Sequence, residues 1–459
     1  MIAQSPHDPH LAARNIRAFV WFRILFNCRF YYPIFAVFFL DMGLSIEQFA
    51  LLNAAWAATI VLLEVPSGAL ADQIGRKRLV VLSGWLMVAE MLVLCLTPAH
   101  SVWTFPLFLI NRILSGTAEA MASGADEALV YDSLPTEGRE SAWRTVNAKL
   151  MHWQSIGFLI SSVLGALVYD AVTLGNTATW LGIQANIEGL ALRLPVLFTL
   201  LSGCGALAMA YTMRDSSPMA RVADNPPWRE QVAASWQGTK DAARWIWRTP
   251  AAFALLLLGL FFDSIIRLFY TVASPFYRLI QIPDALFGVV GAASALIGIA
   301  SAGLGAWILR RNRAGWAFAW VAWLAVFGCL GLAFPIPWFG LLLVAPLMLA
   351  GRLLHFFLSH FLNPITPSDK RATVLSFRGL SMNLAYGSLT LAYGGLSAWL
   401  DGRLPATAPH ADRTLEVFAA SARYWTPWFL LVGALVWLLI RRRCAGPMDA
   451  AMQAGPPSA

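Results

Sequence analysis

Two arginines stand inside long apolar runs of this sequence, where charged side chains are rare. Arg29 and Arg267 are each followed, two and three positions later, by an aromatic residue and a tyrosine, which makes Tyr32 and Tyr270 matching positions. A charge at the centre of a membrane helix costs about 2.5 to 3.5 kcal/mol, so such residues face the protein interior. We therefore predict that all four line a polar cavity. The alternative is that the arginines only hold helices together by bonding to carbonyl groups.

A carboxylate precedes the second arginine by one helical turn. Asp263 and Arg267 are four residues apart with the acid nearer the amino terminus, which is the better order for an ion pair within a helix. We add Asp263 to the predicted cavity. Its affinity for a proton would then depend on whether a bound solute engages Arg267. A static structural pair fits the same spacing.

Other ionisable residues in the apolar runs are candidates for proton coupling. Arg112 and Glu119 are seven residues apart and share one helix face. Three glutamates of these runs are expected to be buried: Glu64, Glu90 and Glu119. The predicted coupling set is Arg112, Glu119, Glu64, Asp263 and Arg352.

The runs that carry these residues predict an all-α membrane protein. The chain has 459 residues, of which 58% are hydrophobic and 13% charged, about half the charged fraction of a soluble domain. A spanning helix needs about 20 apolar residues. Twelve runs meet this requirement: 16–40, 47–71, 79–97, 103–130, 148–169, 193–213, 250–281, 285–309, 315–334, 337–362, 373–400 and 424–440.

The distribution of basic residues predicts the orientation. With the amino terminus inside, 23 of the 33 Lys and Arg residues fall on the cytoplasmic side, five outside and five within the runs. This asymmetry follows the positive-inside rule, places both termini in the cytoplasm and explains the net charge of +8 without a nucleic-acid partner. The five cysteines have neither disulfide nor metal spacing, and we expect no metal and no cofactor.

The two halves of the chain resemble each other. A shift of 238 residues superposes Arg29 on Arg267 and Phe49 on Phe287, and it places Arg352 near the counterpart of Arg112, with His355 one turn later. Six helices per copy predict a parallel repeat with a solute site between the copies. The predicted domains are a six-helix bundle (1–213), a cytoplasmic linker with an amphipathic segment (214–248), a second six-helix bundle (249–443) and a disordered tail (444–459).

A short motif between the second and third runs is the most specific signal. Gly68 allows close helix approach, Asp72 can cap or pair, and Gly75 allows a tight turn before Arg76 and Lys77. The motif resembles the loop between helices 2 and 3 of the major facilitator superfamily. The resemblance implies two pseudo-symmetric six-helix bundles and a cytoplasmic gate made by Gly68, Asp72, Gly75, Arg76 and Lys77.

The resemblance also implies transport. The stretches 64–78 and 126–134 look most like bacterial efflux-type members, and Arg112 with Gly116 is similar to an element associated with the proton path in proton-coupled members. Two features depart from the pattern: helix 5 lacks the glycine-proline signature of drug antiporters, and Arg310 stands where the repeat would place the gate carboxylate. We expect a monomeric, proton-coupled efflux carrier for a small organic solute in the inner membrane, with uptake by symport as the alternative. No P-loop or H-E-x-x-H motif is present, so a membrane enzyme is disfavoured, as is a transporter-like receptor.

Overall fold

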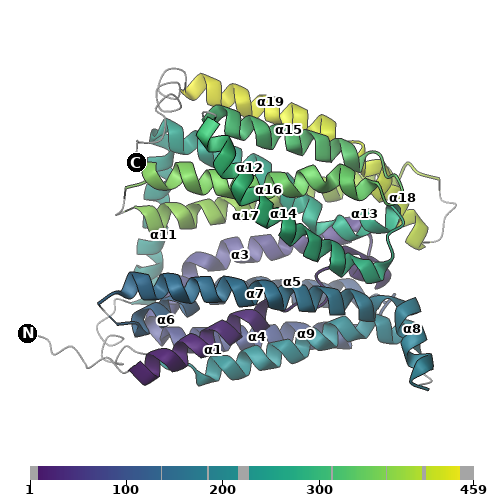
Figure 1. Ribbon diagram of the computed structural model, residues 1–459, viewed down its shortest axis with the longest axis horizontal. Coiled ribbons are helices and arrows are strands. Elements are labelled where there is room, and N and C mark those ends of the chain that lie inside the picture. Colours follow the sequence, from purple (N-terminus) through teal and green to yellow (C-terminus); the bar gives the residue numbers. More distant parts are fainter. Residues whose placement is uncertain are drawn as a thin grey trace, which may run out of the picture. The chain divides into compact units, whose positions relative to one another are not determined.

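The computed structural model describes residues 9–135, 137–182, 186–215, 227–311, 314–367, 370–405 and 410–444. Within these ranges every regular element is a helix and no strand occurs, which confirms the predicted all-α class (Figure 1). In this described part of the chain, eight helical segments are long and apolar enough to cross a membrane. The chain is thus a multi-pass membrane protein.

All twelve predicted runs are helical. The elements are α1 (Pro9–Asn27), α2 (Phe35–Asp41), α3 (Ile46–Ile74), α4 (Arg76–Leu96), α5 (Thr104–Ala122), α6 (Ala125–Ser133), α7 (Arg139–Tyr169), α8 (Ala171–Trp180), α9 (Ile187–Thr212), α11 (Trp228–Arg248), α12 (Pro250–Thr271), α13 (Ala273–Leu279), a 3₁₀ turn η1 (Asp284–Leu286), α14 (Phe287–Arg311), α15 (Ala314–Leu332), α16 (Gly340–Ile365), α17 (Arg371–Asp401), α18 (His410–Ala422) and α19 (Trp425–Cys444). The first, fourth and seventh runs are each divided into two helices.

The chain forms two compact units. Unit 1 comprises residues 1–34 and 58–236. In it α1 and α4 both pack along α9, and α4 packs along α5. The apolar face of α1 is spaced as a helix requires, because Phe19, Phe22 and Phe26 are all buried in one cluster with Met87 of α4 and Ala206 of α9.

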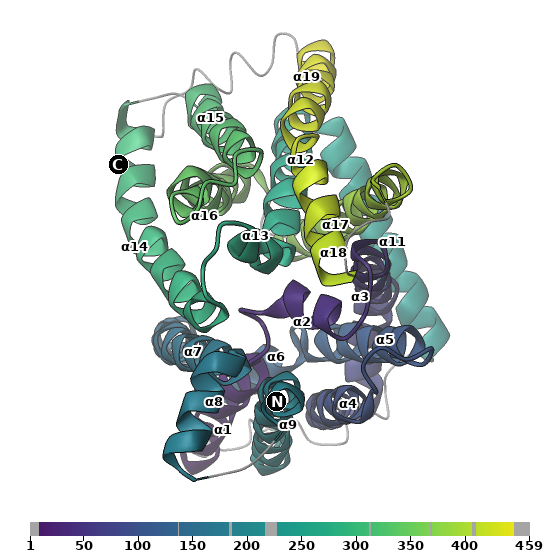
Figure 2. The same ribbon diagram turned by 90° about the vertical axis from the view of Figure 1, so that its right-hand side faces the viewer.

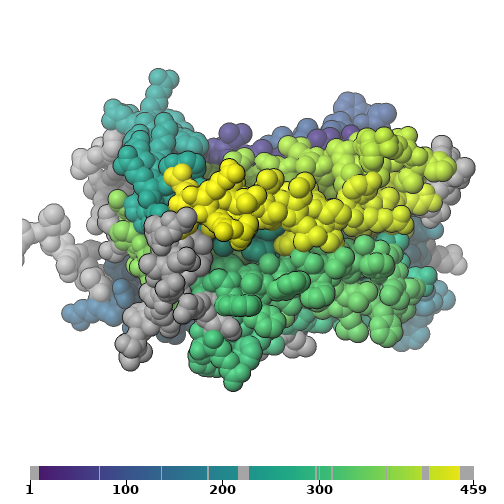
Figure 3. Space-filling view, turned by 90° about the horizontal axis from the view of Figure 1, so that it is seen from above, coloured from purple at the N-terminus to yellow at the C-terminus, as the bar shows by residue number. Residues whose placement is uncertain are grey.

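Unit 2 comprises residues 35–57 and 237–459. In it α12 contacts α16, α17 and α19, and α15 lies along α16 (Figure 2). Small residues permit the close approach of α15 and α16: a Cβ on Gly328 would lie 2.8 Å from the backbone nitrogen of Leu347, and a Cβ on Gly331 2.5 Å from the carbonyl oxygen of Leu343. In Figure 3 α19 lies across the surface of this unit.

The breaks in the first and seventh runs fall at matching places. The shift of 238 residues carries Phe35–Asp41 onto Ala273–Leu279, which are the bounds of α2 and α13. Pro33 explains the first break, because a proline lacks the N–H of a helix and disfavours helical backbone in the residue before it. The Ser274 Oγ of α13 accepts hydrogen bonds of 3.1 Å from the backbone N–H groups of Ala36 and Val37, and so caps α2.

The predicted linker and tail are described only in part. Residues 216–226 and 445–459 lie outside the described residues. The segment with the predicted amphipathic stretch is helical as α11, with Ala242 and Ile246 buried. At its end, the Arg443 guanidinium stacks 3.9 Å from the Trp247 ring centroid and donates to the Trp247 carbonyl at 2.6 Å.

Candidate functional site

Unit 1 contains a buried polar network around Arg29, which we call the Arg29 network. Arg29 Nη1 lies 2.5 Å from Glu90 Oε1 on α4 and donates to the Tyr31 hydroxyl at 3.4 Å. Arg112 of α5 donates to the same hydroxyl at 3.3 Å and to the side-chain oxygen of its neighbour Asn111. All five side chains are almost fully buried.

The break between α1 and α2 positions this network. Arg29 and Tyr31 lie in the non-helical segment 28–34, whose backbone groups need partners in an apolar environment. The Phe30 N–H donates to Thr199 Oγ1 of α9 at 3.0 Å. The Phe30 carbonyl lies so close to Gly165 of α7 that a Cβ there would be 1.8 Å from the oxygen.

Of the other predicted residues of this unit, Tyr32 and Glu119 lie at the edge of the network. Tyr32 is 43% exposed, with its ring centroid 5.8 Å from the Arg29 guanidinium carbon. Glu119 acts electrostatically on Arg29 and Tyr32, but the prediction that it is buried is wrong, since it is exposed. Glu64 is half-buried, and its Oε2 has no hydrogen-bond partner among the described residues.

Unit 2 contains a second polar group, which we call the Asp263 cluster. Arg267 Nη2 lies 2.6 Å from Asp263 Oδ2 within α12, as the four-residue spacing predicts. Its other terminal nitrogen donates to Asn383 Oδ1 of α17 at 2.7 Å. His355 Nε2 of α16 lies 3.5 Å from the second Asp263 oxygen. The Tyr386 ring lies 5.3 Å from the Arg267 guanidinium carbon.

Two further predicted residues lie on the helices of this cluster. The Tyr270 hydroxyl, one turn beyond Arg267, contacts the Met348 carbonyl of α16 at 3.5 Å. Arg352 is exposed on α16, and a Cβ on Gly298 of α14 would lie 3.6 Å from its Nε. Arg352 also acts electrostatically on His355. The structure thus brings the predicted residues of unit 2 to one region.

The predicted gate loop joins α3 to α4. Gly75 has a φ of +91°, a conformation that favours glycine, so the expected tight turn is present. Arg76 forms an ion pair with Asp132 of α6, and the Lys77 N–H donates to Asp215 Oδ1 at 3.2 Å. The Asp72 side chain lies outside the described part.

The expectation for Gly68 is wrong on one point. It was predicted to allow close helix approach, yet an added Cβ would meet no described atom within 4 Å. The neighbouring Ser67 makes the contact in its place, because its hydroxyl donates to the Ala120 carbonyl of α5 at 2.8 Å.

An ion-pair group that the sequence did not reveal joins α2 to α13. Arg278 donates to both Asp41 oxygens at 2.7 and 2.6 Å, and its Nη2 lies 2.6 Å from Asp284 Oδ2. The three side chains are 19% to 26% exposed. One arginine therefore holds two carboxylates at the carboxy-terminal end of both helices.

We expect Arg278→Gln to lower the free energy of unfolding by about 1.5 to 3 kcal/mol, the contribution typical of a hydrogen bond to a charged group. The loss leaves Asp41 and Asp284 facing each other without a cation. Thermal unfolding of the detergent-purified protein measures the effect. Arg278→Lys should restore part of it, because a lysine keeps the charge and loses the two-pronged geometry. Arg423→Gln, on an exposed arginine, is the control, and an equal loss there would contradict the assignment.

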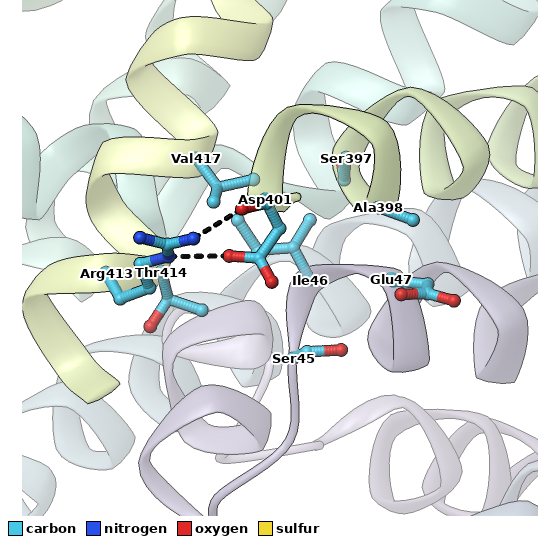
Figure 4. A pocket seen from close by; sticks show the side chains of 9 residues that line it. All are labelled: Ser45, Ile46, Glu47, Ser397, Ala398, Asp401, Arg413, Thr414 and Val417. Carbon is cyan, nitrogen blue, oxygen red and sulfur yellow. Dashed lines mark hydrogen bonds and ion pairs between the residues drawn. The ribbon is translucent and has the colours of Figure 1, made fainter. Parts of the chain in front are cut away.

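Two cavities in unit 2 differ in chemistry. One of about 130 Å³ lies where the start of α3 meets the end of α17, and Figure 4 shows Asp401 and Arg413 facing each other across it at 2.7 Å. The other, of about 370 Å³, is lined almost entirely by apolar and aromatic residues of α12, α17 and α19. Among the described residues no group of His, Cys, Asp and Glu could hold a metal ion.

Comparisons with known proteins agree with this architecture. A family model described as Major Facilitator Superfamily matches residues 18–388. A solved structure of a bacterial homolog to the human lysosomal transporter Spinster, inward-facing and occupied, has a TM-score of 0.66 at 15% identity and covers 96% of this chain and 98% of its own. A structure of the nucleoside transporter NupG has a TM-score of 0.60 at 11% identity and covers 92% of this chain and 98% of its own. A D-xylose-proton symporter has a TM-score of 0.60 at 12% identity and covers 92% of this chain and 97% of its own. No curated protein matches the sequence.

Proposed function

The chain belongs to the major facilitator superfamily, and from that premise we propose that it is a secondary active transporter. It moves a small organic solute across the cytoplasmic membrane by alternating access, and a proton gradient drives the movement. The carrier acts as a monomer with both termini in the cytoplasm. Cysteine labelling from each side of the membrane tests the orientation, and labelling of the two termini from opposite sides would contradict it.

The observation that carries the proposal is the Asp263 cluster. Asp263 is 4% exposed on a membrane-spanning helix, and its two oxygens face different partners, Arg267 and His355. Arg267 is the only one of the three whose charge is fixed, because an arginine keeps its proton in proteins. When a solute engages Arg267, Asp263 loses its counter-charge and binds a proton more readily. Solute binding and protonation are thereby linked.

We expect Asp263→Asn to abolish proton-driven transport and to spare solute binding, because an amide cannot exchange the proton. Solutes that stabilise the purified protein in a thermal-shift screen would be tested in proteoliposomes, with and without a pH gradient. Counterflow, the exchange of labelled against unlabelled solute, should continue in the variant. Glu416→Gln, on an exposed glutamate of α18, is the matched control. Gradient-driven transport that persists in Asp263→Asn would refute this coupling site.

We propose efflux as the direction, because the stretches 64–78 and 126–134 resemble efflux-type members. Uptake by symport is the second candidate. The fifth predicted run lies in α7, which contains no proline and so lacks the glycine-proline signature of drug antiporters. Efflux and uptake differ in whether protons move against the solute or together with it. In the efflux mode, solute added outside inverted vesicles should drive protons out of the lumen and acidify the outside. In the symport mode, the same solute should carry protons into the lumen, and the outside should not acidify.

A further inference from the structure

The spanning helices of unit 2 carry more positive than negative charge. Across α12 and α14 to α17, the only acids are Asp263 and Asp401, and Asp401 is the last residue of α17. Three arginines lie in the interior of the same helices: Arg267, Arg352 and Arg378. Two positive charges therefore remain after Asp263 has been paired.

Two of the three arginines, Arg352 and Arg378, are unpaired among the described residues and lie within electrostatic range of His355. Arg267 is engaged by Asp263 and Asn383. Arg352 and Arg378 make no hydrogen bond or ion pair with any described residue, yet both act electrostatically on His355. Arg378 also lies within electrostatic range of Asp263. The His355 side chain is 58% exposed, so the group is open on the side of the histidine.

The depth of Arg352 in its helix favours a bound counter-ion. It lies 12 residues from the start and 13 from the end of α16, which is about 18 and about 20 Å from the two ends at 1.5 Å per residue. This is near the middle of a hydrocarbon layer about 30 Å thick. A charge held there without a partner is costly, and lipid headgroups lie at the bilayer surface.

We propose that the transported solute is an organic anion whose carboxylate or phosphate group is held by Arg352 and Arg378 beside His355. This inference rests on the proposed transport function and adds the substrate class to it. The planar guanidinium fork matches two oxygens of a carboxylate or phosphate at once. The anion supplies the negative charge that α12 and α14 to α17 lack.

The test uses the full chain purified in a non-ionic detergent. Succinate and glycerol 3-phosphate are compared with their neutral counterparts, succinamide and glycerol, at equal ionic strength. We expect the anions to raise the midpoint of thermal unfolding and the neutral probes to leave it unchanged. The anion concentration needed to raise the midpoint should increase about tenfold in Arg352→Gln and in Arg378→Gln, because each change removes charge-assisted hydrogen bonds to the anion. For Arg378→Lys, this concentration should lie between those of the wild type and of Arg378→Gln. For Arg442→Gln, at the end of α19, it should equal that of the wild type.

Three outcomes would overturn the proposal: equal stabilisation by neutral and anionic probes, anion binding unchanged in Arg378→Gln, or stabilisation in nanodiscs by phosphatidylglycerol but by no soluble anion. If a glutamine variant fails to fold, the wild-type comparison of anion with neutral counterpart still decides. Counterflow of a neutral or cationic solute alone would keep the transport function and refute the anion site. Anion binding that depends on both arginines, without transport of either anion, would uphold the site and refute the transport function.

Discussion

We expect Glu90→Gln to lower the free energy of unfolding by about 3 to 5 kcal/mol, the cost typical of removing one partner of a buried ion pair. Glu90 is fully buried, and Arg29, at 2.5 Å, is 3% exposed. The glutamine keeps the shape of the side chain and removes the charge. Arg29 would then lie in an apolar interior without a counter-charge, with the variant's neutral amide and the Tyr31 hydroxyl as polar neighbours.

The measurement is chemical or thermal unfolding in detergent. Glu188→Gln, on the exposed first turn of α9, removes a glutamate that forms no ion pair with a described residue and serves as the control. The double variant Arg29→Met with Glu90→Met should recover most of the stability, because well-packed apolar residues often replace a buried ion pair without loss. A Glu90→Gln protein as stable as the wild type would mean that the pair contributes no stability.

The double variant also separates the two interpretations of Arg29. If Arg29 only holds helices together, the refilled Met pair should be stable and should transport solute. If Arg29 belongs to the solute pathway, the same protein should be stable and inactive. Stability and transport measured on one sample therefore distinguish packing from function.

The helices could be predicted from the sequence because the bilayer imposes a simple requirement. An apolar run of about 20 residues has few alternatives to a helix, since every backbone group must be satisfied internally. All twelve predicted runs are helical for this reason. The short helices α8 and α18 were not predicted, because neither is long enough or apolar enough to stand out as a spanning run.

Candidate site residues could be recognised more easily than their partners. Arg29 and Arg267 stood out because charge inside an apolar run is costly. The Asp263–Arg267 pair was predicted because both residues lie on one helix, four positions apart. Glu90 is 61 positions from Arg29, and periodicity says nothing about which helices meet. The same reason hid Asn383 of α17 and the electrostatic effect of Asp263 on Arg378.

The boundaries of the two units could be found only from the structure. Residues 35–57 belong to unit 2 although they follow α1 of unit 1 directly. Contacts such as the Ser274 cap on α2 and the approach of Gly394 to Ala50, 3.0 Å from an added Cβ, hold this segment there. Each joins residues that are more than 200 positions apart in the sequence.

We expect Gly165→Ala to be among the most damaging single-methyl changes in the chain. The added Cβ would lie 1.8 Å from the Phe30 carbonyl oxygen and 2.6 Å from its carbon. Both are backbone atoms, so no side chain can rotate away to make room. Overpacking of this kind costs about 1 to 3 kcal/mol, occasionally more.

The location makes the effect functional as well as structural. Phe30 follows Arg29 in the non-helical segment, so a displacement of its carbonyl moves Arg29 relative to Glu90. We therefore expect Gly165→Ala to lower both the unfolding midpoint and transport. Gly303→Ala in α14, where an added Cβ meets no described atom within 4 Å, is the matched control. Because alanine forms helices better than glycine, the control should be as stable as the wild type or more so. Equal behaviour of the two variants would show that the backbone at Phe30 yields to α7 and does not fix the position of Arg29.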